Sequence, residues 1–351
     1  MVSTVAFIGL GHMGGPMAAN LVRAGHRVLG HDLLPDLLAT AAATGVEPAA
    51  SAAEAAAAAD VVITMLPAGR HVLALYREQG LLAAARPGTL FVDCSTIDVA
   101  DARTAHEAAG AAGMRSLDAP VSGGVVGAEA ATLTFMAGGD TPEFTEAEPL
   151  LAAMGRKAVH CGKPGAGQAA KICNNMILGV SMIAVSEAFV LAESLGLSHQ
   201  ALYDVASTAS GQCWALTANC PVPGPVPGSP ANRDHRPGFA APLMAKDLGL
   251  AANAARAGGV DAELGLRAAE LYAAYAQGTG AEKDFSGIVS AVRERSAVSA
   301  ERELTAVVGT EREREPVVGT EVVGTEREPA RVSRTEREPT QVHRGTGEED
   351  A

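Results

Sequence analysis

The sequence predicts an α/β chain in which a doubly wound parallel sheet comes first, a long helix follows, and an all-helical domain completes the fold. Three observations support this prediction. Short β-branched segments alternate with helical segments up to about residue 163, helical patterns alone dominate to about residue 295, and a repetitive segment without aromatic residues runs to the end. Strands that alternate with helices form parallel βαβ units. We therefore expect domains at residues 1–163, 164–295 and 296–351.

The first strand is expected at residues 2–8, where a β-branched run ends at Gly9. Similar short runs, most of them closed by a turn residue, predict the later strands at residues 27–30, 61–66, 89–93, 116–119 and 132–137. Helical spacing or a high alanine content predicts the helices between them, at residues 15–23, 52–59, 71–85 and 101–112.

One long helix is expected at residues 164–195, because apolar helical spacing continues after the turn Gly162-Lys-Pro-Gly165. Helical patterns also fill most of the domain that follows. The exception is residues 219–239, which are rich in Pro, Gly, Asn and Arg and predict a long loop. Loops of this length in compact domains are usually functional.

Low-complexity repeats mark the last segment. Val-Val-Gly-Thr-Glu occurs at positions 307, 317 and 322, and Glu, Arg, Thr, Pro and Gly prevail around it. Such a composition buries too little apolar surface to offset chain entropy, so residues 296–351 are predicted to be a disordered tail. The tail could be solubilising, could bind a partner, or could have no role.

The composition narrows the possible partners. With 40 acidic against 27 basic side chains, the chain of 351 residues carries a net charge of −13. Nucleic acid and anionic lipid surfaces repel such a protein, so we expect neither as a partner. The most apolar long stretch, residues 176–191, is interrupted by Ser181, Ser186 and Glu187. We therefore expect no membrane span, no signal peptide and a cytoplasmic location.

The five cysteines lack the spacing of a metal site. They are Cys94, Cys161, Cys173, Cys213 and Cys220. Their odd number and wide spacing favour reduced thiols and no metal. For Cys173, a small buried apolar role is the simplest interpretation.

A glycine-rich turn follows the first strand and opens the first helix. Its residues are Gly9, Leu10, Gly11, His12, Met13 and Gly14. The G-x-G-x-x-G spacing in this context is typical of a dinucleotide site in a Rossmann domain. Gly9 would allow the sharp turn, Gly11 would let the backbone approach a pyrophosphate, and Gly14 would let helix and strand pack closely. A glycine-rich turn without a nucleotide is the alternative.

An acidic residue stands where the ribose is expected. Asp32 follows the second strand, 18 positions after Gly14. Its carboxylate would hold ribose hydroxyls and repel a 2′-phosphate, which predicts NAD rather than NADP. A protonated His31 would soften that repulsion. His12 is either a solvent-facing loop residue or a phosphate contact.

A lysine and an amide share one face near the start of the long helix. Lys171 and Asn175 are four residues apart, so their side chains are neighbours. Burial and a nearby nicotinamide cation would lower the pKa of Lys171 toward the working pH. Such an amine can take a proton from an alcohol and return it to a carbonyl. The alternatives are a lysine that extends into solvent and an asparagine that only caps buried backbone.

A third segment suits a carboxylate. Ser122, Gly123 and Gly124 combine a hydroxyl with unobstructed backbone N–H groups. We expect them to bind the acid group of a substrate, with Asn175 holding its hydroxyl or carboxylate. A plain turn is the alternative.

Several motifs occur in a fixed order over residues 3–295. They are Gly9 to Leu21, Asp118-Ala-Pro-Val-Ser-Gly-Gly124, Gly165 to Asn175, and Lys246-Asp-Leu-Gly-Leu-Ala251. With these motifs the chain resembles the β-hydroxyacid dehydrogenase family, and within it the dehydrogenases of 3-hydroxyisobutyrate. The narrower resemblance rests on Trp214, Pro221-Val-Pro-Gly224, Ala231-Asn232, Gly238-Phe239 and Lys283-Asp-Phe-Ser286.

The resemblance implies oxidation of a small 3-hydroxy acid, 3-hydroxyisobutyrate, to methylmalonate semialdehyde with NAD, which is a step of valine breakdown. Lys171 would be the general acid and base on an interdomain helix, and the all-α domain would also build a homodimer or homotetramer. Leu66 and Pro67 would line the adenosine side, Thr96 would lie near the nicotinamide, and Lys246 would reach over the cofactor.

Two further positions bear on the cofactor. Phe239, at the end of the long loop, could shield the nicotinamide from water. His71 stands where relatives that resemble the mammalian enzyme carry asparagine, so one cofactor hydrogen bond is in doubt.

Other functions fit parts of the same pattern. Tartronate semialdehyde, glyoxylate or succinic semialdehyde could be the substrate of a related reductase. An NAD-binding regulator with a partner-binding tail is a hypothesis of another class, although intact Lys171 and Asn175 argue against a loss of catalysis.

Overall fold

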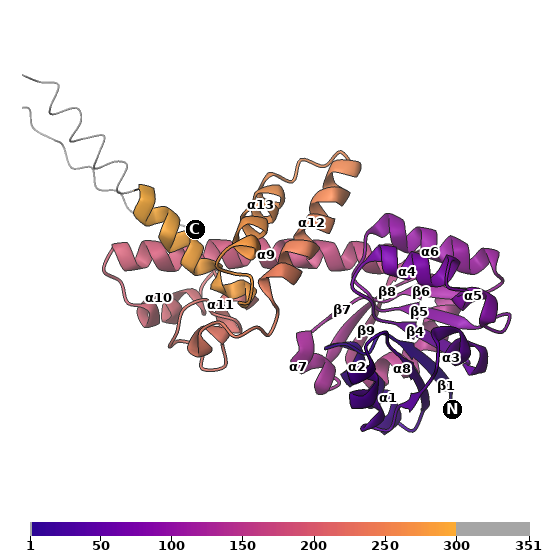
Figure 1. Cartoon of the computed structure of the whole chain (residues 1–351). Coiled ribbons are helices and arrows are strands. Elements are labelled where there is room, and N and C mark those ends of the chain that lie inside the picture. Colours follow the sequence, from indigo (N-terminus) through magenta and orange to yellow (C-terminus); the bar gives the residue numbers. More distant parts are fainter. Residues whose placement is uncertain (1, 300–351) are drawn as a thin grey trace, which may run out of the picture. The chain divides into compact units, whose positions relative to one another are not determined.

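The computed structural model describes residues 2–299, in which one sheet of nine strands precedes a helical region (Figure 1). The strands are β1 (Thr4–Ile8), β2 (Arg27–His31), β3 (Glu47–Pro48), β4 (Val61–Thr64), β5 (Leu90–Asp93), β6 (Arg115–Asp118), β7 (Val121–Ser122), β8 (Leu133–Gly138) and β9 (Gly155–Gly162). The helices between them are α1 (Gly14–Arg23), α2 (Pro35–Ala42), α3 (Ala52–Ala58), α4 (Gly69–Arg77), α5 (Leu81–Ala84), α6 (Val99–Ala111), α7 (Gly124–Glu129) and α8 (Thr141–Met154).

The strand order confirms the predicted doubly wound sheet. Neighbouring strands follow the order β3-β2-β1-β4-β5-β6-β8-β7, and β9 pairs with β8. The first six are parallel, whereas β8 is antiparallel to β6 and β7. The order reverses between β1 and β4, and ligands of such sheets bind outside the carboxyl ends of the strands at this reversal.

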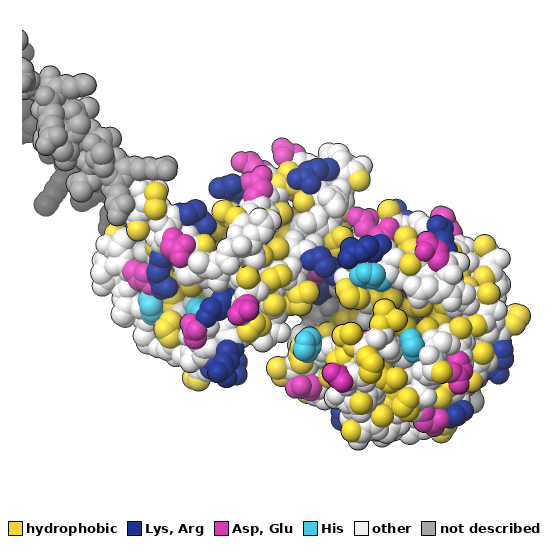
Figure 2. Space-filling view, in the orientation of Figure 1, with side chains coloured by type: hydrophobic (Ala, Val, Ile, Leu, Met, Phe, Trp, Pro, Cys, Tyr) yellow, Lys and Arg dark blue, Asp and Glu magenta, His cyan; other side chains and the backbone are white. Residues whose placement is uncertain are grey.

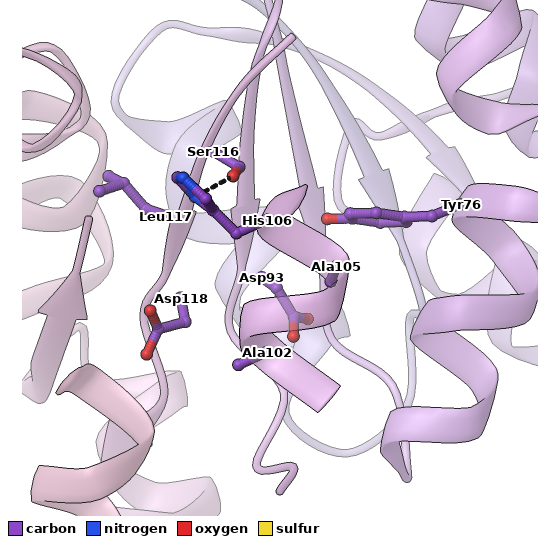
Figure 3. A pocket seen from close by; sticks show the side chains of 8 residues that line it. All are labelled: Tyr76, Asp93, Ala102, Ala105, His106, Ser116, Leu117 and Asp118. Atoms are coloured by element: carbon purple, nitrogen blue, oxygen red, sulfur yellow. Dashed lines mark hydrogen bonds between the residues drawn. The ribbon is translucent and has the colours of Figure 1, made fainter. Parts of the chain in front are cut away.

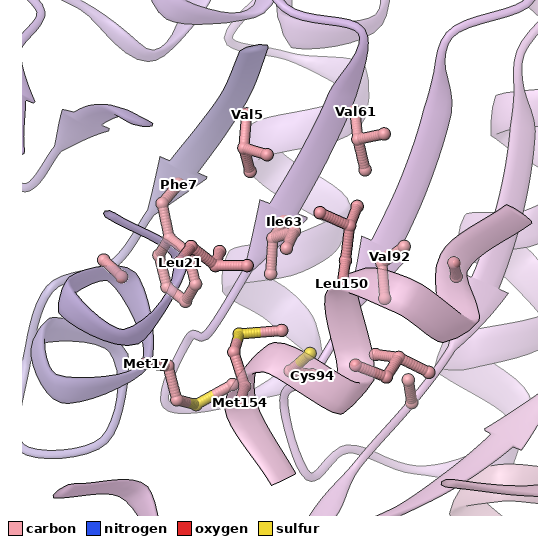
Figure 4. Close-up of a cluster of buried hydrophobic side chains, with 14 of the residues drawn as sticks. Val5, Phe7, Met17, Leu21, Val61, Ile63, Val92, Cys94, Leu150 and Met154 are labelled. Atoms are coloured by element: carbon pink, nitrogen blue, oxygen red, sulfur yellow. The ribbon is translucent and has the colours of Figure 1, made fainter. Parts of the chain in front are cut away.

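Apolar layers cover both faces of the sheet. On one face Phe7 and Ile63 lie in a cluster with Met17 and Leu21 of α1 and with Met154 of α8 (Figure 4). On the other face the alternate strand residues cluster with apolar side chains of α3, α4, α5 and α6. Because successive side chains of a strand point to opposite faces, strands buried on both sides become continuous apolar runs.

Helices follow the last strand. They are α9 (Ala166–Ser194), α10 (His199–Ala206), α11 (Trp214–Thr217), α12 (Ala241–Ala257), α13 (Glu263–Gln277) and a helical segment at residues 288–299. Buried Met182, Met244, Leu248, Tyr272 and Phe285 join these elements in a separate apolar cluster. Between α11 and α12 the only regular element is the 3₁₀ turn Pro230–Arg233, so the predicted long loop is confirmed.

By length and composition, α9 could cross a membrane, and it is the only such helix in residues 2–299. It packs against β8, α12 and α13, and its buried face carries Gln168, Lys171 and Asn175. These contacts favour a helix that belongs to the core of the protein.

Several predicted elements differ from the observed ones. The helix expected at residues 71–85 is two helices, because Gly80 adopts a left-handed φ of 73° between α4 and α5. The strand expected at residues 61–66 ends at Thr64. The prediction omitted α2, α7 and α8, the two-residue strands β3 and β7, and β9, whose sequence lacks a β-branched run.

The predicted start of the tail is wrong. Residues 296–299 belong to the helix that begins at residue 288, and Ile288, Val289 and Val292 of that helix are buried. The rest of the predicted tail, residues 300–351, lies outside the described residues.

Candidate active site at the carboxyl edge of the sheet

The glycine-rich turn lies at the carboxyl end of β1, beside the reversal of strand order. Gly9 has a φ of 94°, and a Cβ there would collide with the Met65 carbonyl oxygen. A Cβ on Gly14 would collide with the Gly9 carbonyl oxygen, whereas one on Gly11 would meet no described atom within 4 Å. Packing therefore requires glycine at positions 9 and 14, and the open space at Gly11 is what the approach of a pyrophosphate needs.

The other members of this turn differ in exposure. Leu10 is buried, Met13 is half-buried and His12 is exposed, so the His12 side chain faces solvent at the mouth of the turn. Its contact with a phosphate stays a prediction.

Asp32 contacts the same turn. Its Oδ2 accepts the Leu10 N–H at 2.7 Å and its Oδ1 accepts the Leu34 N–H at 2.9 Å, which fixes the carboxylate beside the turn. The neighbouring His31 ring bonds through Nδ1 to the Ala49 carbonyl at 3.2 Å. The position of Asp32 suits the predicted contact with ribose hydroxyls.

Lys246 crosses from α12 to the edge of the sheet. Its Nζ donates to the Thr96 carbonyl at 2.7 Å and to the Pro67 carbonyl at 3.0 Å. Leu66 donates its N–H to Ser95 Oγ at 2.8 Å. One ammonium therefore joins the loops that follow β4 and β5, and these loops contain the three residues for which the resemblance implies cofactor contacts.

Lys171 and Asn175 lie on consecutive turns of α9 and face Asp247 of α12. The three residues are 6 %, 1 % and 4 % exposed. Asn175 Nδ2 donates to Asp247 Oδ2 at 2.6 Å, while Lys171 Nζ lies 4.0 Å from the same oxygen. At that distance Lys171 has a counter-charge but remains free to hydrogen bond to another group.

Burial governs the protonation of this cluster. It lowers the pKa of Lys171, an effect that Asp247 opposes and Lys246 reinforces. Burial also raises the pKa of Asp247, and the charges of Lys171 and Lys246 oppose this shift. A lowered pKa makes the neutral amine of Lys171 accessible nearer to neutral pH, and the neutral amine is the form that accepts a proton.

Two buried carboxyls lie behind these loops. Asp93 ends β5 and Asp118 ends β6, and both line a small cavity with Tyr76 and His106 (Figure 3). The cavity offers about 10 Å³ to water, roughly the space that one molecule needs. Burial raises the pKa of Asp93 to about 6, although hydrogen bonds from Ser95 and Thr64 oppose the shift.

The turn Ser122-Gly123-Gly124 connects β7 to α7. Both glycines have positive φ, 140° and 63°. A Cβ on Gly124 would lie 3.2 Å from the Gly238 carbonyl oxygen. The structure therefore places the predicted carboxylate cradle against the end of the long loop, and its substrate contact stays a prediction.

Phe239 is half-buried, and its ring packs edge-on against Phe285 with the ring centroids 5.6 Å apart. Phe239 therefore has a structural contact in the helical core, and its shielding of the nicotinamide stays a prediction.

Cys173 is exposed, so its predicted burial is wrong. It lies two residues from Lys171, which turns it to the other side of α9.

His71 Nδ1 is buried and has no hydrogen-bond partner among the described residues, so it is free to bond a ligand.

The sequence alone does not single out Asp247. Charged residues at consecutive positions commonly lie in solvent, and only the packing of α12 against α9 brings this carboxylate to Lys171. Its place beside Lys246 in the motif that ends at Ala251 is the one signal that could have indicated it.

Two family models of known proteins match the sheet domain and the helical region of the chain. Residues 4–162 match the family model of the NAD binding domain of 6-phosphogluconate dehydrogenase. Residues 165–292 match the model described as NAD-binding of NADP-dependent 3-hydroxyisobutyrate dehydrogenase.

Individual relatives agree with the family models. A probable 3-hydroxyisobutyrate dehydrogenase of Mycobacterium bovis is 57% identical over 295 residues, which span 84% of this chain and 99% of that protein. An NAD-dependent L-serine dehydrogenase of Pseudomonas aeruginosa is 49% identical over 283 residues, 80% of this chain and 95% of that protein. The solved structure of Mycobacterium tuberculosis 3-hydroxyisobutyrate dehydrogenase with L-serine has 58% identity and a TM-score of 0.81, and the match covers 84% of this chain and all of that one.

The matched ranges span the positions of the glycine-rich turn, of Asp32, and of the α9 and α12 residues described above. The open space at Gly11 fits a dinucleotide. The chain belongs to the 3-hydroxyisobutyrate dehydrogenase family of NAD-dependent oxidoreductases.

Proposed function

We propose that this protein oxidises 3-hydroxyisobutyrate to methylmalonate semialdehyde with NAD, as a step of valine breakdown, and that Lys171 is its general acid and base. The observation that carries the proposal is the buried Lys171 amine. Burial lowers the pKa of this amine. The neighbouring helix α12 carries Lys246, which bonds the Thr96 loop at the cofactor edge of the sheet. The names of similar proteins support the choice of substrate.

The site residues divide the chemistry among them. Bound NAD would supply the acceptor for the hydride of the carbinol carbon. The neutral Lys171 Nζ accepts the hydroxyl proton, and the Asp247 carboxylate at 4.0 Å stabilises the ammonium that forms. Asn175, held by Asp247, orients the hydroxyl, while Ser122, Gly123 and Gly124 hold the substrate carboxylate. In the reverse direction the Lys171 ammonium protonates the carbonyl oxygen.

The surface charge disfavours a nucleic-acid partner. Acidic and basic side chains are interspersed over the visible face of the described residues (Figure 2). Nucleic acid requires a continuous basic patch, and the net charge of −13 disfavours one.

Substitution of Lys171 by alanine tests the proposal. Turnover of 3-hydroxyisobutyrate should fall by about a hundredfold or more, the usual contribution of a general base, while the affinity for NAD changes little. Exposed Arg77 provides the control, because R77A removes a positive charge from the last turn of α4. Steady-state NADH formation and NAD titration measure the two effects. Near-normal turnover of K171A would overturn the assigned role.

L-Serine is the second candidate substrate. It is also a 3-hydroxy acid, a 49% identical relative is named an L-serine dehydrogenase, and the similar solved structure is that of the Mycobacterium tuberculosis enzyme with L-serine. Values of kcat/KM for 3-hydroxyisobutyrate, L-serine, and the semialdehydes and glyoxylate in the reducing direction would decide between them. A clear preference for L-serine would replace the first choice of substrate without changing the role of Lys171.

We also propose that the protein forms a homodimer or homotetramer through α9. Ile177, Ala184, Ala188, Leu191 and Leu195 are exposed and three to seven residues apart. This spacing places them along one stripe of the helix, where small and apolar side chains allow a second copy to pack closely.

Light scattering after size-exclusion chromatography tests the assembly. The unsubstituted protein should have a multiple of the 35.5 kDa chain mass, and L191K should lower it. V260K adds the same charge at an exposed position outside α9 and should leave the mass unchanged. A monomer before substitution would refute the proposal.

A further inference from the structure

We propose that Gln168 is a positioning residue of the NAD site, because its side chain sets the loop around Thr96 and thereby the contact that Lys246 makes there. The part of this inference that concerns turnover rests on the proposed function. The part that concerns NAD binding rests only on the NAD site.

The Gln168 amide spans the Thr96 loop on both sides. Its Nε2 donates to the Ser95 carbonyl at 2.7 Å, and its Oε1 accepts the Ile97 N–H at 3.1 Å. Gln168 is fully buried, so water cannot replace either bond. A planar amide bonded at both ends therefore holds the backbone before and after Thr96 in one position.

The Thr96 loop is also the acceptor of the interdomain contact. Its carbonyl receives Lys246 Nζ at 2.7 Å, and the Pro67 carbonyl receives the same ammonium at 3.0 Å. An ammonium placed by two carbonyl oxygens moves when one of them moves. Gln168 is thus coupled to Lys246 through a shared backbone segment.

Asp93 and Ser95 connect this segment to the neighbouring loop. Asp93 Oδ1 accepts bonds from Ser95 Oγ at 2.6 Å and from Thr64 Oγ1 at 2.7 Å, and Ser95 Oγ in turn accepts the Leu66 N–H at 2.8 Å. Asp93 Oδ2 has no partner among the described residues, and Asp93 lines the cavity of Figure 3. The loops after β4 and β5 therefore form one hydrogen-bonded unit, which Gln168 joins to α9.

The same residue sets the beginning of α9. The Asp118 carboxylate accepts the Gly165 N–H at 2.7 Å and the Gln168 N–H at 2.8 Å, which anchors the first turn of the helix to β6. Lys171 follows Gln168 by three residues, about one turn. Gln168 thus fixes the position of α9, which carries Lys171, relative to the Thr96 loop, which accepts the Lys246 hydrogen bond.

Replacement of Gln168 by glutamate tests the inference through pH. A protonated carboxyl can donate to the Ser95 carbonyl and accept the Ile97 N–H, as the amide does, whereas a carboxylate cannot donate. Burial raises the pKa of a carboxyl at this position. The ratio of NAD affinities, Q168E to unsubstituted protein, should therefore be near one at about pH 6 and should fall about tenfold by about pH 9.

Other ionisable groups near position 168 are present in both proteins, so their own titration largely cancels in the ratio. They are Asp93, Asp118, Arg103 near Gly165, Lys171 on the same helix, and Lys246 beyond Thr96. If infrared difference spectra show that the introduced carboxyl loses its proton between about pH 6 and about pH 9, a ratio that stays constant over this range would overturn the inference.

Q168M gives a second test, because it keeps the length of the side chain and removes both bonds. NAD affinity and kcat should fall about tenfold at every pH, while KM for the hydroxy acid changes little. Combined with K246A, the loss should be clearly smaller than the product of the two single losses, because both act through Thr96. Multiplicative losses would contradict the coupling.

S186A is the matched control. It removes a buried hydroxyl that bonds the Met182 carbonyl farther along α9, and should lower stability without changing NAD affinity or the pH ratio. If Q168M does not fold, the pH ratio of Q168E still decides. If the unsubstituted protein binds NAD but does not oxidise 3-hydroxyisobutyrate, the proposed substrate fails while the NAD titrations still test Gln168.

Discussion

The protonation of Lys171 depends on its neighbours. A lysine in water has a pKa of about 10.4, so it is almost fully protonated at neutral pH and is a poor base there. Here burial lowers the pKa, and Asp247 limits the shift, so that the amine stays within reach of protonation. Asn175, which bonds the same carboxylate oxygen, fixes the side of Asp247 that faces the lysine.

Removal of the Asp247 charge should change the pH dependence of oxidation. Because Asp247 raises the pKa of Lys171, D247N should lower that pKa further and move the rising limb of kcat against pH to lower pH. A weaker base and a less stabilised ammonium should also reduce the maximum by about tenfold. The full pH profile measures both changes. D261N, at an exposed carboxylate, is the control, and a D247N limb that moves to higher pH would contradict the assignment.

Asp32 should decide the choice of cofactor. D32A removes the carboxylate that repels a 2′-phosphate and that also accepts the Leu10 N–H. We expect weaker NAD binding and about a tenfold gain in the NADP-to-NAD ratio of kcat/KM. Steady-state kinetics with both cofactors provide the measurement. D36A, an exposed change in the first turn of α2, should leave the ratio unaltered. An unchanged ratio in D32A would remove Asp32 from the ribose site.

At the scale of elements, the first turn of α9 packs tightly against the sheet. It lies against the ends of β6 and β8, where a Cβ on Gly167 would collide with the Met136 carbonyl oxygen and approach the Asp118 carbonyl oxygen to 2.8 Å. This close approach keeps Gln168 and Lys171 near the carboxyl edge of the sheet. Glycine is required here by packing, not by backbone conformation, because Gly167 lies within the helix.

G167A should therefore destabilise the protein by about 1–3 kcal/mol, the usual penalty for overpacking a rigid contact. G249A in α12 is the matched control, because a Cβ there would meet no described atom within 4 Å. It should be neutral or should stabilise the helix by up to about 1 kcal/mol. Denaturant unfolding measures both changes. If G167A were as stable as G249A, the close approach would not constrain α9.

At the scale of the whole molecule, the site depends on contacts between distant parts of the chain. Lys246 bonds Pro67 and Thr96 across separations of 179 and 150 residues, and Asn175 bonds Asp247 across 72. The family model of the helical region ends at residue 292, and the solved relative is covered completely by 84% of this chain. The matched regions therefore do not require residues 300–351.

A protein truncated after Ser299 should keep its activity and stability. We expect kcat within about twofold and a melting temperature within about 2 °C of the full-length values, because the matched family regions remain intact. Truncation after Gly287 is the control; it removes buried Ile288, Val289 and Val292 and should unfold the protein. Melting curves and steady-state rates test both. A large loss after truncation at Ser299 would show that residues 300–351 support the enzyme.

Local patterns in the sequence determined the alternation of strands and helices, the glycine-rich turn with Asp32, the long helix carrying Lys171, and the long loop. These features depend on residues close together in the chain, so periodicity and turn chemistry are enough to predict them. The same patterns did not predict β9, the break at Gly80 or the exposure of Cys173.

Only the tertiary structure decided which side chains meet. Periodicity and turn chemistry do not reveal the roles of Asp247 and Gln168, because these roles depend on partners more than 70 residues away that packing brings within hydrogen-bond distance. Burial is likewise a property of the folded chain, and it is burial that shifts the pKa of Lys171. The sequence alone therefore determined which chemical groups are available, and the fold decided their neighbours and their protonation.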